Sequence, residues 1–315
     1  MVTIAALGDD FVLPELIESS VRDRVADHLN FTLAKLPWPI VPFGPIENVN
    51  EASGSEDEVI AATKNASIAM THLAPFTKRV FESCPSLRML AVCRGGPVNV
   101  DLEAATEAGV LVTYAPGRNA QAAAEFTVGM MMAAMRRIGD ANSELHRGTW
   151  RGDYYTYSNA GMELSGSTVG IIGFGAIGKL VARFLAPFGA KILVHDPFFD
   201  AKLENQEFEN VSLDELLMRS NVVSIHARLT EQSKHLLNRS NLSLLQDGSV
   251  LVNTARGGLL DYDALPELLE SGKLGAIALD VYDQEPPPNS WALLGRNNVV
   301  LAPHLAGATR QTAER

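Results

Sequence analysis

An arginine, a glutamate and a histidine near the end of the chain carry side chains that could act together in acid–base chemistry: Arg256, Glu285 and His304. Each lies beside or just after a short apolar run that predicts a buried β-strand; the runs are Ser249–Asn253, Gly275–Val281 and Asn298–Leu301. Because ligands bind at the carboxyl ends of parallel strands, we expect the three side chains to meet over one crevice. The planar guanidinium of Arg256 could bind a carboxylate, and His304 could exchange a proton at a neighbouring oxygen. Glu285 could hydrogen-bond the far side of the imidazole and favour its charged form.

A glycine-rich turn lies upstream, in T-V-G-I-I-G-F-G-A-I-G at residues 168–178. Gly173, Gly175 and Gly178 have G-x-G-x-x-G spacing, between a predicted strand and a predicted helix at Lys179–Phe188. The first glycine permits a tight turn, the second lets the backbone approach a pyrophosphate, and the third lets the helix pack on the strand. The helix amino end then offers N–H groups to phosphates. The pattern predicts a dinucleotide-binding unit; the alternative is a glycine turn that binds nothing.

A second apolar strand, Lys191–His195, ends at Asp196. This is where a dinucleotide-binding unit places an acid that accepts hydrogen bonds from the adenosine ribose. Pro197, Phe198 and Phe199 follow, without a basic side chain to hold a 2′-phosphate. The pattern therefore favours NAD over NADP, with Asp196 as a simple helix cap being the alternative.

Each of the three reactive residues also has an ordinary explanation. Arg256 could form a structural ion pair, Glu285 could be a surface acid before the prolines at 286–288, and His304 could be a core histidine. Taken singly, these explanations are the more common ones. The joint placement of the three residues downstream of the glycine turn favours a site.

A further glycine pair occurs in C-R-G-G-P-V-N-V-D, residues 93–101. Gly95 and Gly96 free the backbone to present N–H groups to an anion such as a carboxylate, and Arg94 could add charge. A plain turn explains these residues equally well.

Apolar strand-like runs alternate with amphipathic stretches along most of the chain, which predicts an α/β fold with parallel sheets. The chain of 315 residues is long enough for about two domains, and Ala115-Pro116-Gly117 is a natural hinge. The further predicted strands are 2–7, 67–70, 87–92, 110–114 and 222–226. The predicted helices before and after the glycine turn are 13–29, 56–63, 77–83, 102–108, 119–137, 213–218, 237–245 and 263–271, and residues 36–45 are expected to be extended or loop.

The composition excludes several classes of partner. A net charge of −11 disfavours binding to nucleic acid or to anionic membranes. No apolar run approaches the ~20 residues of a membrane span, and the amino terminus lacks the basic lead of a secretory signal. Cys84 and Cys93 show no metal-ligand spacing and fit a reducing cytoplasm, so no metal site is expected.

Several stretches resemble the D-isomer-specific 2-hydroxyacid dehydrogenase family, which includes D-lactate, glycerate and 3-phosphoglycerate dehydrogenases. They are R-G-G-P-V-N-V-D, P-G-R-N-A, E-L-S-G-S-T-V-G-I-I-G-F-G-A-I-G, D-P, V-N-T-A-R-G-G-L-L-D, A-L-D-V-Y-D-Q-E-P and A-P-H-L-A-G-A-T. The resemblance implies two Rossmann-like doubly wound parallel-sheet domains with a cleft between them. An NAD-binding domain at 118–303 would be inserted into a substrate domain made of 1–117 and 304–315. It also implies a homodimer held largely by helix 119–137.

The same resemblance implies an NAD-dependent oxidoreductase that interconverts a small D-2-hydroxy acid and its 2-keto acid by hydride transfer. Arg256, Glu285 and His304 match the catalytic residues of the family. Gly95 and Gly96 match its carboxylate-binding loop, where Arg94 and Arg256 add charge. The matched cofactor-binding positions are Gly173, Gly175, Ala176, Ile177, Gly178, Asp196, His226, Ala227, Thr254, Ala255, Asp280 and His304.

Some positions depart from the family pattern. Arg228 stands where the family often has proline, and no arginine occurs in Ala69–His72, where phosphoglycerate enzymes carry a phosphate-binding one. This argues against 3-phosphoglycerate unless Arg94 or Arg118 substitutes. Compared with the family, the end at Arg315 suggests a truncated or abbreviated carboxyl terminus. The alternative functions are an NAD(H)-sensing, corepressor-like binding protein and a phosphite or formate dehydrogenase.

Overall fold

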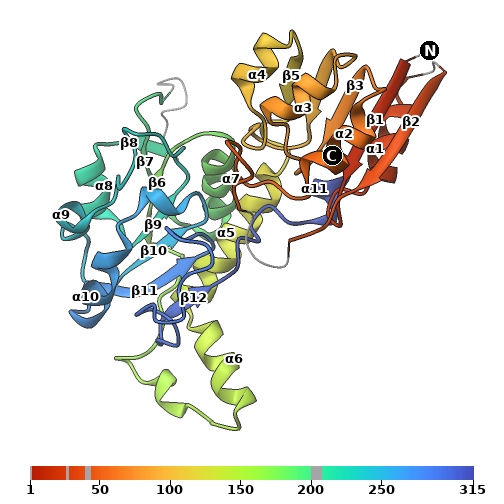
Figure 1. Cartoon of the computed structure of the whole chain (residues 1–315). Coiled ribbons are helices and arrows are strands. Elements are labelled where there is room, and N and C mark those ends of the chain that lie inside the picture. Colours follow the sequence, from red (N-terminus) through yellow and green to blue (C-terminus); the bar gives the residue numbers. More distant parts are fainter. Residues whose placement is uncertain (1, 26–27, 40–43, 200–207) are drawn as a thin grey trace. The chain divides into compact units, whose positions relative to one another are not determined.

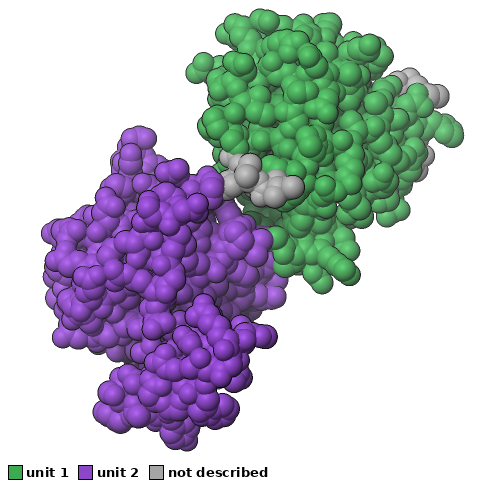
Figure 2. Space-filling view, turned by 60° about the horizontal axis from the view of Figure 1, so that its bottom comes forward, with its two compact units in different colours: residues 1–119, 308–315 green, residues 120–307 purple. Residues whose placement is uncertain are grey.

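The computed structural model describes residues 2–25, 28–39, 44–199 and 208–315. The chain forms two compact units, which Figure 2 shows in separate colours. Unit 1 consists of Met1–Asn119 and Ala308–Arg315, and unit 2 of Ala120–Gly307. The sequence places these two divisions a few residues earlier, after residues 117 and 303.

Unit 1 is built on a five-stranded parallel sheet in the order β2-β1-β3-β4-β5. Its core is made of apolar side chains from the strands and the helices that cover them, such as Leu7, Val59 and Leu90. The strands are β1 (Val2–Gly8), β2 (Leu29–Lys35), β3 (Ile68–Thr71), β4 (Met89–Val92) and β5 (Leu111–Tyr114). The helices are α1 (Pro14–Arg22), α2 (Glu56–Thr63), α3 (Lys78–Ser83), α4 (Leu102–Glu107) and α11 (Arg310–Glu314).

Unit 2 is built on a seven-stranded parallel sheet in the order β12-β11-β10-β9-β6-β7-β8 (Figure 1). Its strands are β6 (Thr168–Ile172), β7 (Lys191–His195), β8 (Phe208–Asn210), β9 (Val222–Ile225), β10 (Ser249–Asn253), β11 (Leu274–Leu279) and β12 (Val299–Leu301). Its helices are α5 (Ala120–Met135), α6 (Ile138–His146), α7 (Ala176–Leu185), α8 (Leu213–Arg219), α9 (Arg239–Leu242) and α10 (Leu265–Glu270). The expected α/β class with two parallel sheets is confirmed.

Successive side chains of the unit 2 strands enter opposite faces of the sheet, as the strand geometry requires. Ile171 packs in a cluster with residues of α5 and α7, whereas its neighbour Ile172 packs with residues of α8 and α10. Leu251 and Val252 of β10 alternate in the same way. The strands are therefore apolar on both faces, which is why they occur in the sequence as continuous hydrophobic runs.

The predicted helix at 13–29 is wrong in its second half. The helix α1 ends at Arg22, and residues 29–35 form the edge strand β2, whose partly exposed L-N-F-T-L-A-K lacks a continuous apolar signal. The predicted helix at 119–137 stops at Met135, because Arg137 has a left-handed φ of 52° and a separate helix α6 begins after it. The predicted helix at 237–245 is reduced to α9. Residues 40–43 of the expected extended segment lie outside the described residues.

Candidate active site

His304 and Glu285 form a hydrogen-bonded pair in unit 2, with His304 Nδ1 2.9 Å from Glu285 Oε2. His304 follows β12 and adopts a left-handed backbone, with φ of 56°. The hydrogen bond that His304 donates to Glu285 raises the pKa of His304, although burial acts against it. The imidazole therefore keeps a proton to higher pH than an ordinary histidine, and its Nε2 is left for another partner.

Asp280 fixes the turn that carries His304. Its side chain is fully buried, and its two carboxylate oxygens accept hydrogen bonds from the N–H groups of Leu305 at 2.7 Å and Ala306 at 2.8 Å. The N–H of His304 donates to the Asp280 carbonyl oxygen at 2.9 Å. Burial raises the pKa of Asp280, whereas the two N–H donors lower it. The sequence assigns Asp280 to the cofactor; the contacts described here show it bound to the backbone around His304.

Arg256 lies on the turn after β10, and the buried side chain of Asn253 shapes that turn. Asn253 Nδ2 donates to the Arg256 carbonyl oxygen at 3.0 Å, and Asn253 Oδ1 accepts from Ala255 N at 3.1 Å. The Arg256 guanidinium donates to the Ala255 carbonyl oxygen at 2.7 Å and makes no other hydrogen bond or ion pair within the described chain. Its charge lowers the pKa of His304, against the effect of Glu285. Arg256 thus has donors left for an anion.

The loops that carry Arg256 and Glu285 are held together by close backbone contact. A Cβ at Gly257 would overlap the Tyr282 carbonyl oxygen, so only glycine fits there. Tyr282 N donates to Glu285 Oε1 at 3.1 Å, which orients the other carboxylate oxygen toward His304. The structure therefore brings Arg256, Glu285 and His304 to one edge of the unit 2 sheet.

The glycine turn has the shape that a dinucleotide requires. A Cβ at Gly175 would meet no atom within 4 Å, so the backbone is open to a ligand there. Gly173 has φ of 90° and lies against the Ala227 backbone nitrogen, 2.6 Å from the position of a Cβ, whereas a Cβ at Gly178 would overlap the Gly173 carbonyl oxygen. The helix α7 then begins at Ala176 without a side-chain cap. Its first N–H groups are thus available to a pyrophosphate.

The groups around the outer half of this turn also fit NAD. Asp196 lies at the end of β7, and its carboxylate accepts hydrogen bonds from Phe174 N at 2.6 Å and Phe198 N at 2.8 Å. These bonds orient the carboxylate beside the turn. His226, after β9, is bonded to the Ser224 hydroxyl at 2.9 Å, and burial lowers its pKa to about 3. Neither the neutral His226 nor the Asp196 carboxylate offers a positive charge to hold a 2′-phosphate.

The remaining predicted cofactor positions lie on the same elements. Ala176 and Ile177 form the first turn of α7, and Ala255 precedes Arg256. The Thr254 hydroxyl is hydrogen-bonded to the Thr127 hydroxyl at 2.6 Å, so it anchors α5 to the end of β10.

The predicted carboxylate-binding loop belongs to unit 1. A Cβ at Gly95 or Gly96 would meet no atom within 4 Å, so both backbones are accessible. Arg94 is already engaged, because its Nη1 donates to the Glu51 carbonyl oxygen at 3.0 Å and its Nη2 pairs with the Glu51 carboxylate. Arg94 therefore orders the loop through Glu51.

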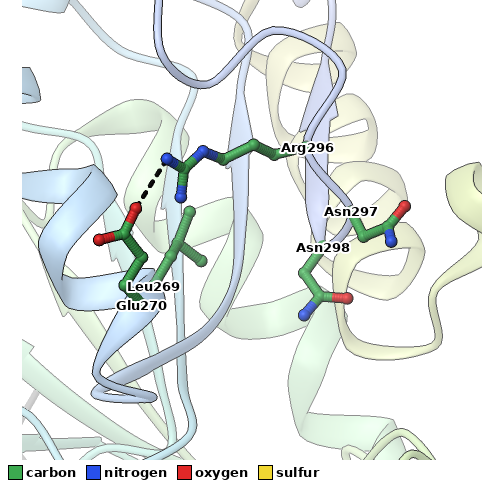
Figure 3. Close-up of a pocket in the computed structure, with 5 residues that line it drawn as sticks. All are labelled: Leu269, Glu270, Arg296, Asn297 and Asn298. Carbon is green, nitrogen blue, oxygen red and sulfur yellow. Dashed lines mark hydrogen bonds and ion pairs between the residues drawn. The ribbon is translucent and has the colours of Figure 1, made fainter.

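A pocket of about 290 Å³ in unit 2 is not part of this site (Figure 3). It is lined by Leu269, Glu270, Arg296, Asn297 and Asn298. These residues precede β11 and β12, so the pocket lies at the amino ends of the strands, whereas the reactive residues lie at the carboxyl ends. Arg296 is paired with Glu270 at 2.8 Å, so its charge is satisfied within the pocket.

Sequence reasoning missed a buried pair in unit 1. His72 Nδ1 lies 2.7 Å from Asp9 Oδ2, at the carboxyl ends of β3 and β1. No short motif joins residues so far apart in the chain; the only available signal was that each follows a predicted strand. No group of His, Cys, Asp and Glu in the described ranges is arranged to hold a metal ion, and no helix there is long and apolar enough to cross a membrane.

Comparison with known proteins places these features in a family. Residues 128–306 match the family described as D-isomer specific 2-hydroxyacid dehydrogenase, NAD binding domain. The glyoxylate reductase of Thermofilum pendens is 39% identical over 238 residues, 75% of this chain and 70% of that protein. The hydroxypyruvate reductase of Thermotoga maritima is 39% identical over 242 residues, covering 76% and 77%. The structure of D-lactate dehydrogenase from Escherichia coli aligns with a TM-score of 0.76 and 27% identity, over 99% of this chain and 92% of that one. The chain therefore belongs to the D-isomer-specific 2-hydroxyacid dehydrogenase family, as an oxidoreductase with its NAD-binding domain at residues 128–306.

Proposed function

We propose that the protein interconverts a small D-2-hydroxy acid and its 2-keto acid. The observation that carries the proposal is the hydrogen bond between His304 and Glu285, in the same unit as the glycine turn. NAD supplies the hydride chemistry when bound. His304 delivers a proton from Nε2 to the keto oxygen in reduction and takes it back in oxidation. Because Glu285 occupies Nδ1 and raises the pKa of the imidazole, the acid form persists nearer neutral pH.

Arg256 and the Gly95–Gly96 loop would bind the acid. The free donors of Arg256 match a carboxylate and the adjacent keto oxygen, and the planar guanidinium fixes their orientation. In unit 1, the open backbone of the two glycines also suits a carboxylate. These contacts hold the reacting carbon in place, while Asp280 keeps His304 aimed through the turn at 304–306.

The proposal favours NAD over NADP. The first N–H groups of α7 would hold the pyrophosphate, and Asp196 would accept hydrogen bonds from the ribose hydroxyls. A 2′-phosphate would bring negative charge toward the carboxylate of Asp196, with His226 neutral. NADH is therefore expected to give the higher kcat/KM.

A steady-state assay tests the reaction. Glyoxylate and hydroxypyruvate are the first acids to try, because similar proteins are named glyoxylate reductase and hydroxypyruvate reductase. Pyruvate and longer 2-keto acids are tested next. NADH oxidation with at least one acid, giving the D-isomer where the product is chiral, is expected. The Arg256→Met variant should show a raised KM for the acid and an unchanged Kd for NADH. Binding of NADH without turnover of any acid would instead support a sensing protein, and turnover of phosphite or formate alone would replace the substrate class.

We also propose a homodimer, formed through α6 and the segment after it. The helix α5, which the sequence assigns to the interface, packs mainly on α7, β10 and β11 of its own unit. By contrast, large apolar side chains are exposed from residue 138 to 157; they are Ile138, Leu145, Trp150, Tyr155 and Tyr157. Exposed apolar patches of this kind mark protein interfaces. Sedimentation equilibrium should show a dimer, and the double variant Leu145→Ser, Trp150→Ser should be monomeric; a wild-type monomer would refute the proposal.

A further inference from the structure

The carboxyl edge of the unit 1 sheet gathers charged groups that the proposed chemistry does not use. Asp9 follows β1, His72 follows β3, and Arg118 lies on the turn after β5. The Phe11 ring lies beside them, with its centroid 5.5 Å from that of His72 and 6.0 Å from the Arg118 guanidinium carbon. We name Asp9, Phe11, His72 and Arg118 the unit 1 edge cluster.

All but one of the ionisable side chains in and beside the unit 1 edge cluster have a hydrogen-bond or ion-pair partner within the protein. The buried Asp9 carboxylate accepts hydrogen bonds from Phe11 N and Val12 N, both at 2.9 Å, and binds His72 at 2.7 Å. Burial lowers the pKa of His72, so the imidazole is neutral and donates from Nδ1. The neighbouring Arg94 is paired with Glu51. The side chains of Asp9, His72 and Arg94 are therefore held in place by contacts within unit 1.

Arg118 is the exception. It is half-buried, and its guanidinium makes no hydrogen bond or ion pair with any residue of the described chain. Its guanidinium carbon lies over the face of Phe11, and the charge of Asp9 acts in favour of its charged form. Burial lowers the pKa of Arg118 from its usual value, yet the group remains charged at neutral pH. A guanidinium withdrawn from water without acceptors is destabilising unless a ligand supplies them.

The backbone places Arg118 next to the predicted carboxylate-binding loop of the same unit. Ala115 N donates to the Arg94 carbonyl oxygen at 2.7 Å, directly before Gly95 and Gly96. Arg118 N donates back to the Ala115 carbonyl oxygen at 3.3 Å, across a turn in which Gly117 has φ of 83°. The turn that carries Arg118 is thus hydrogen-bonded to the residue directly before the glycine pair, within unit 1.

We propose that Arg118 is a second anion-binding group, which recognises a carboxylate or phosphate on the substrate at the end away from the reacting carbon. The substrate is then a 2-hydroxy or 2-keto acid with two anionic groups. The inference rests on the proposed function and adds the substrate class. The oxygens of Asp9 already have three hydrogen-bond partners, and Asp9 forms no ion pair with Arg118 within the described residues.

Paired substrates test this assignment. With NADH, kcat/KM is measured for 2-oxobutyrate against oxaloacetate, and for hydroxypyruvate against its 3-phosphate. In at least one pair, the wild-type protein should prefer the acid with the second anionic group. A preference for oxaloacetate would indicate that Arg118 binds a carboxylate, and a preference for the 3-phosphate that it binds a phosphate. Arg118→Met should reduce that preference about 10- to 100-fold, the loss expected for a charge-assisted hydrogen-bonded contact. Arg118→Lys, which keeps the charge but not the fork, should fall between.

Arg79→Met is the matched control, because Arg79 is an exposed arginine of the same unit, paired with Glu56 and Asp57. It should leave the preference unchanged. Arg118→Met should also melt no lower than the wild-type protein, since it removes an unpaired charge. A wild-type preference for the acid with a single anionic group in both pairs, or an unchanged preference in Arg118→Met, would overturn the inference. Failure of the wild-type protein to reduce any acid would refute the proposed function itself.

Discussion

Replacing Glu285 by glutamine removes the charge beside His304 and keeps a group that can accept its Nδ1 hydrogen. In the wild-type protein the hydrogen bond and charge of Glu285 raise the pKa of His304. Reduction of a 2-keto acid requires the protonated imidazole, so its rate declines as the pH rises through this raised pKa. In Glu285→Gln the pKa of His304 is lower, and the decline in reduction must occur at lower pH. Oxidation of the hydroxy acid requires the neutral imidazole, and it must extend to lower pH.

The size of the effect follows from the geometry of the pair. Two unit charges about 4 Å apart interact by about 1 kcal/mol in water and about 4 kcal/mol at the effective dielectric of a protein surface. The side chains of His304 and Glu285 are 35% and 26% exposed, so solvent screens the pair and the lower part of this range applies. An interaction of about 1–2 kcal/mol corresponds to an about 5- to 30-fold change in the protonation equilibrium. Reduction by Glu285→Gln at alkaline pH should therefore be about 5- to 30-fold slower.

The assay is kcat/KM for the keto acid with NADH across the pH range, together with the reverse reaction. At a pH below the pKa that His304 has in either protein, the reduction rates should converge, because His304 is protonated in both. Glu270→Gln is a suitable control, since Glu270 is a carboxylate paired with Arg296 at the opposite edge of the sheet. Coincident pH profiles for the wild-type protein and Glu285→Gln, or a displacement toward higher pH, would refute the assigned role of the pair.

Two glycines of the turn should respond differently to alanine. Gly178→Ala forces a Cβ against a carbonyl oxygen and should destabilise the protein by about 1–3 kcal/mol, seen as a lower Tm. Gly175→Ala meets no atom within 4 Å, so its Tm should hold while the Kd for NADH rises in a fluorescence titration; equal losses of stability would contradict this. Asp280→Asn replaces one oxygen that fixes the turn after His304, and it should lower kcat by up to about 10²-fold with the Kd for NADH unchanged. A raised Kd with kcat intact would make Asp280 a cofactor contact instead.

The parts of the fold that the sequence predicted are those whose signals are local. The strands at 168–172, 191–195 and 249–253 occur at the expected residues, because their central side chains are buried on both faces and form short apolar runs. Gly173 and Gly178 were predicted for the same reason, since neighbouring backbone forbids a Cβ at each position. Burial of a strand and close backbone contact at a glycine each restrict only a few neighbouring residues, so both can be predicted from a single sequence.

The features that escaped prediction depend on residues far apart in the chain. The strand β2 at 29–35 pairs only with β1, and its alternating exposure left no apolar run to detect. The Asp9–His72 hydrogen bond forms only when the ends of β1 and β3 come together. The hydrogen bond from Ala306 N to the Asp280 carboxylate likewise joins residues far apart in the chain. Likewise, the sequence could not decide between Arg94 and Arg118 as a free cation; the ion pair of Arg94 with Glu51 was needed for that.

Unit 1 is discontinuous in the chain, and this has a consequence for how the protein is made. The helix α11 packs on α1, and the Arg315 guanidinium donates to the Arg118 carbonyl oxygen at 3.1 Å, so residues 308–315 add a helix to a unit whose described strands are all translated first. Unit 2 is contiguous, and it can finish folding on the ribosome while unit 1 still lacks α11. A nonsense codon just before residue 308 would therefore leave every described strand of both sheets in the product. Unit 1 would still lack α11, and the surface of α1 that contacts α11 would be exposed.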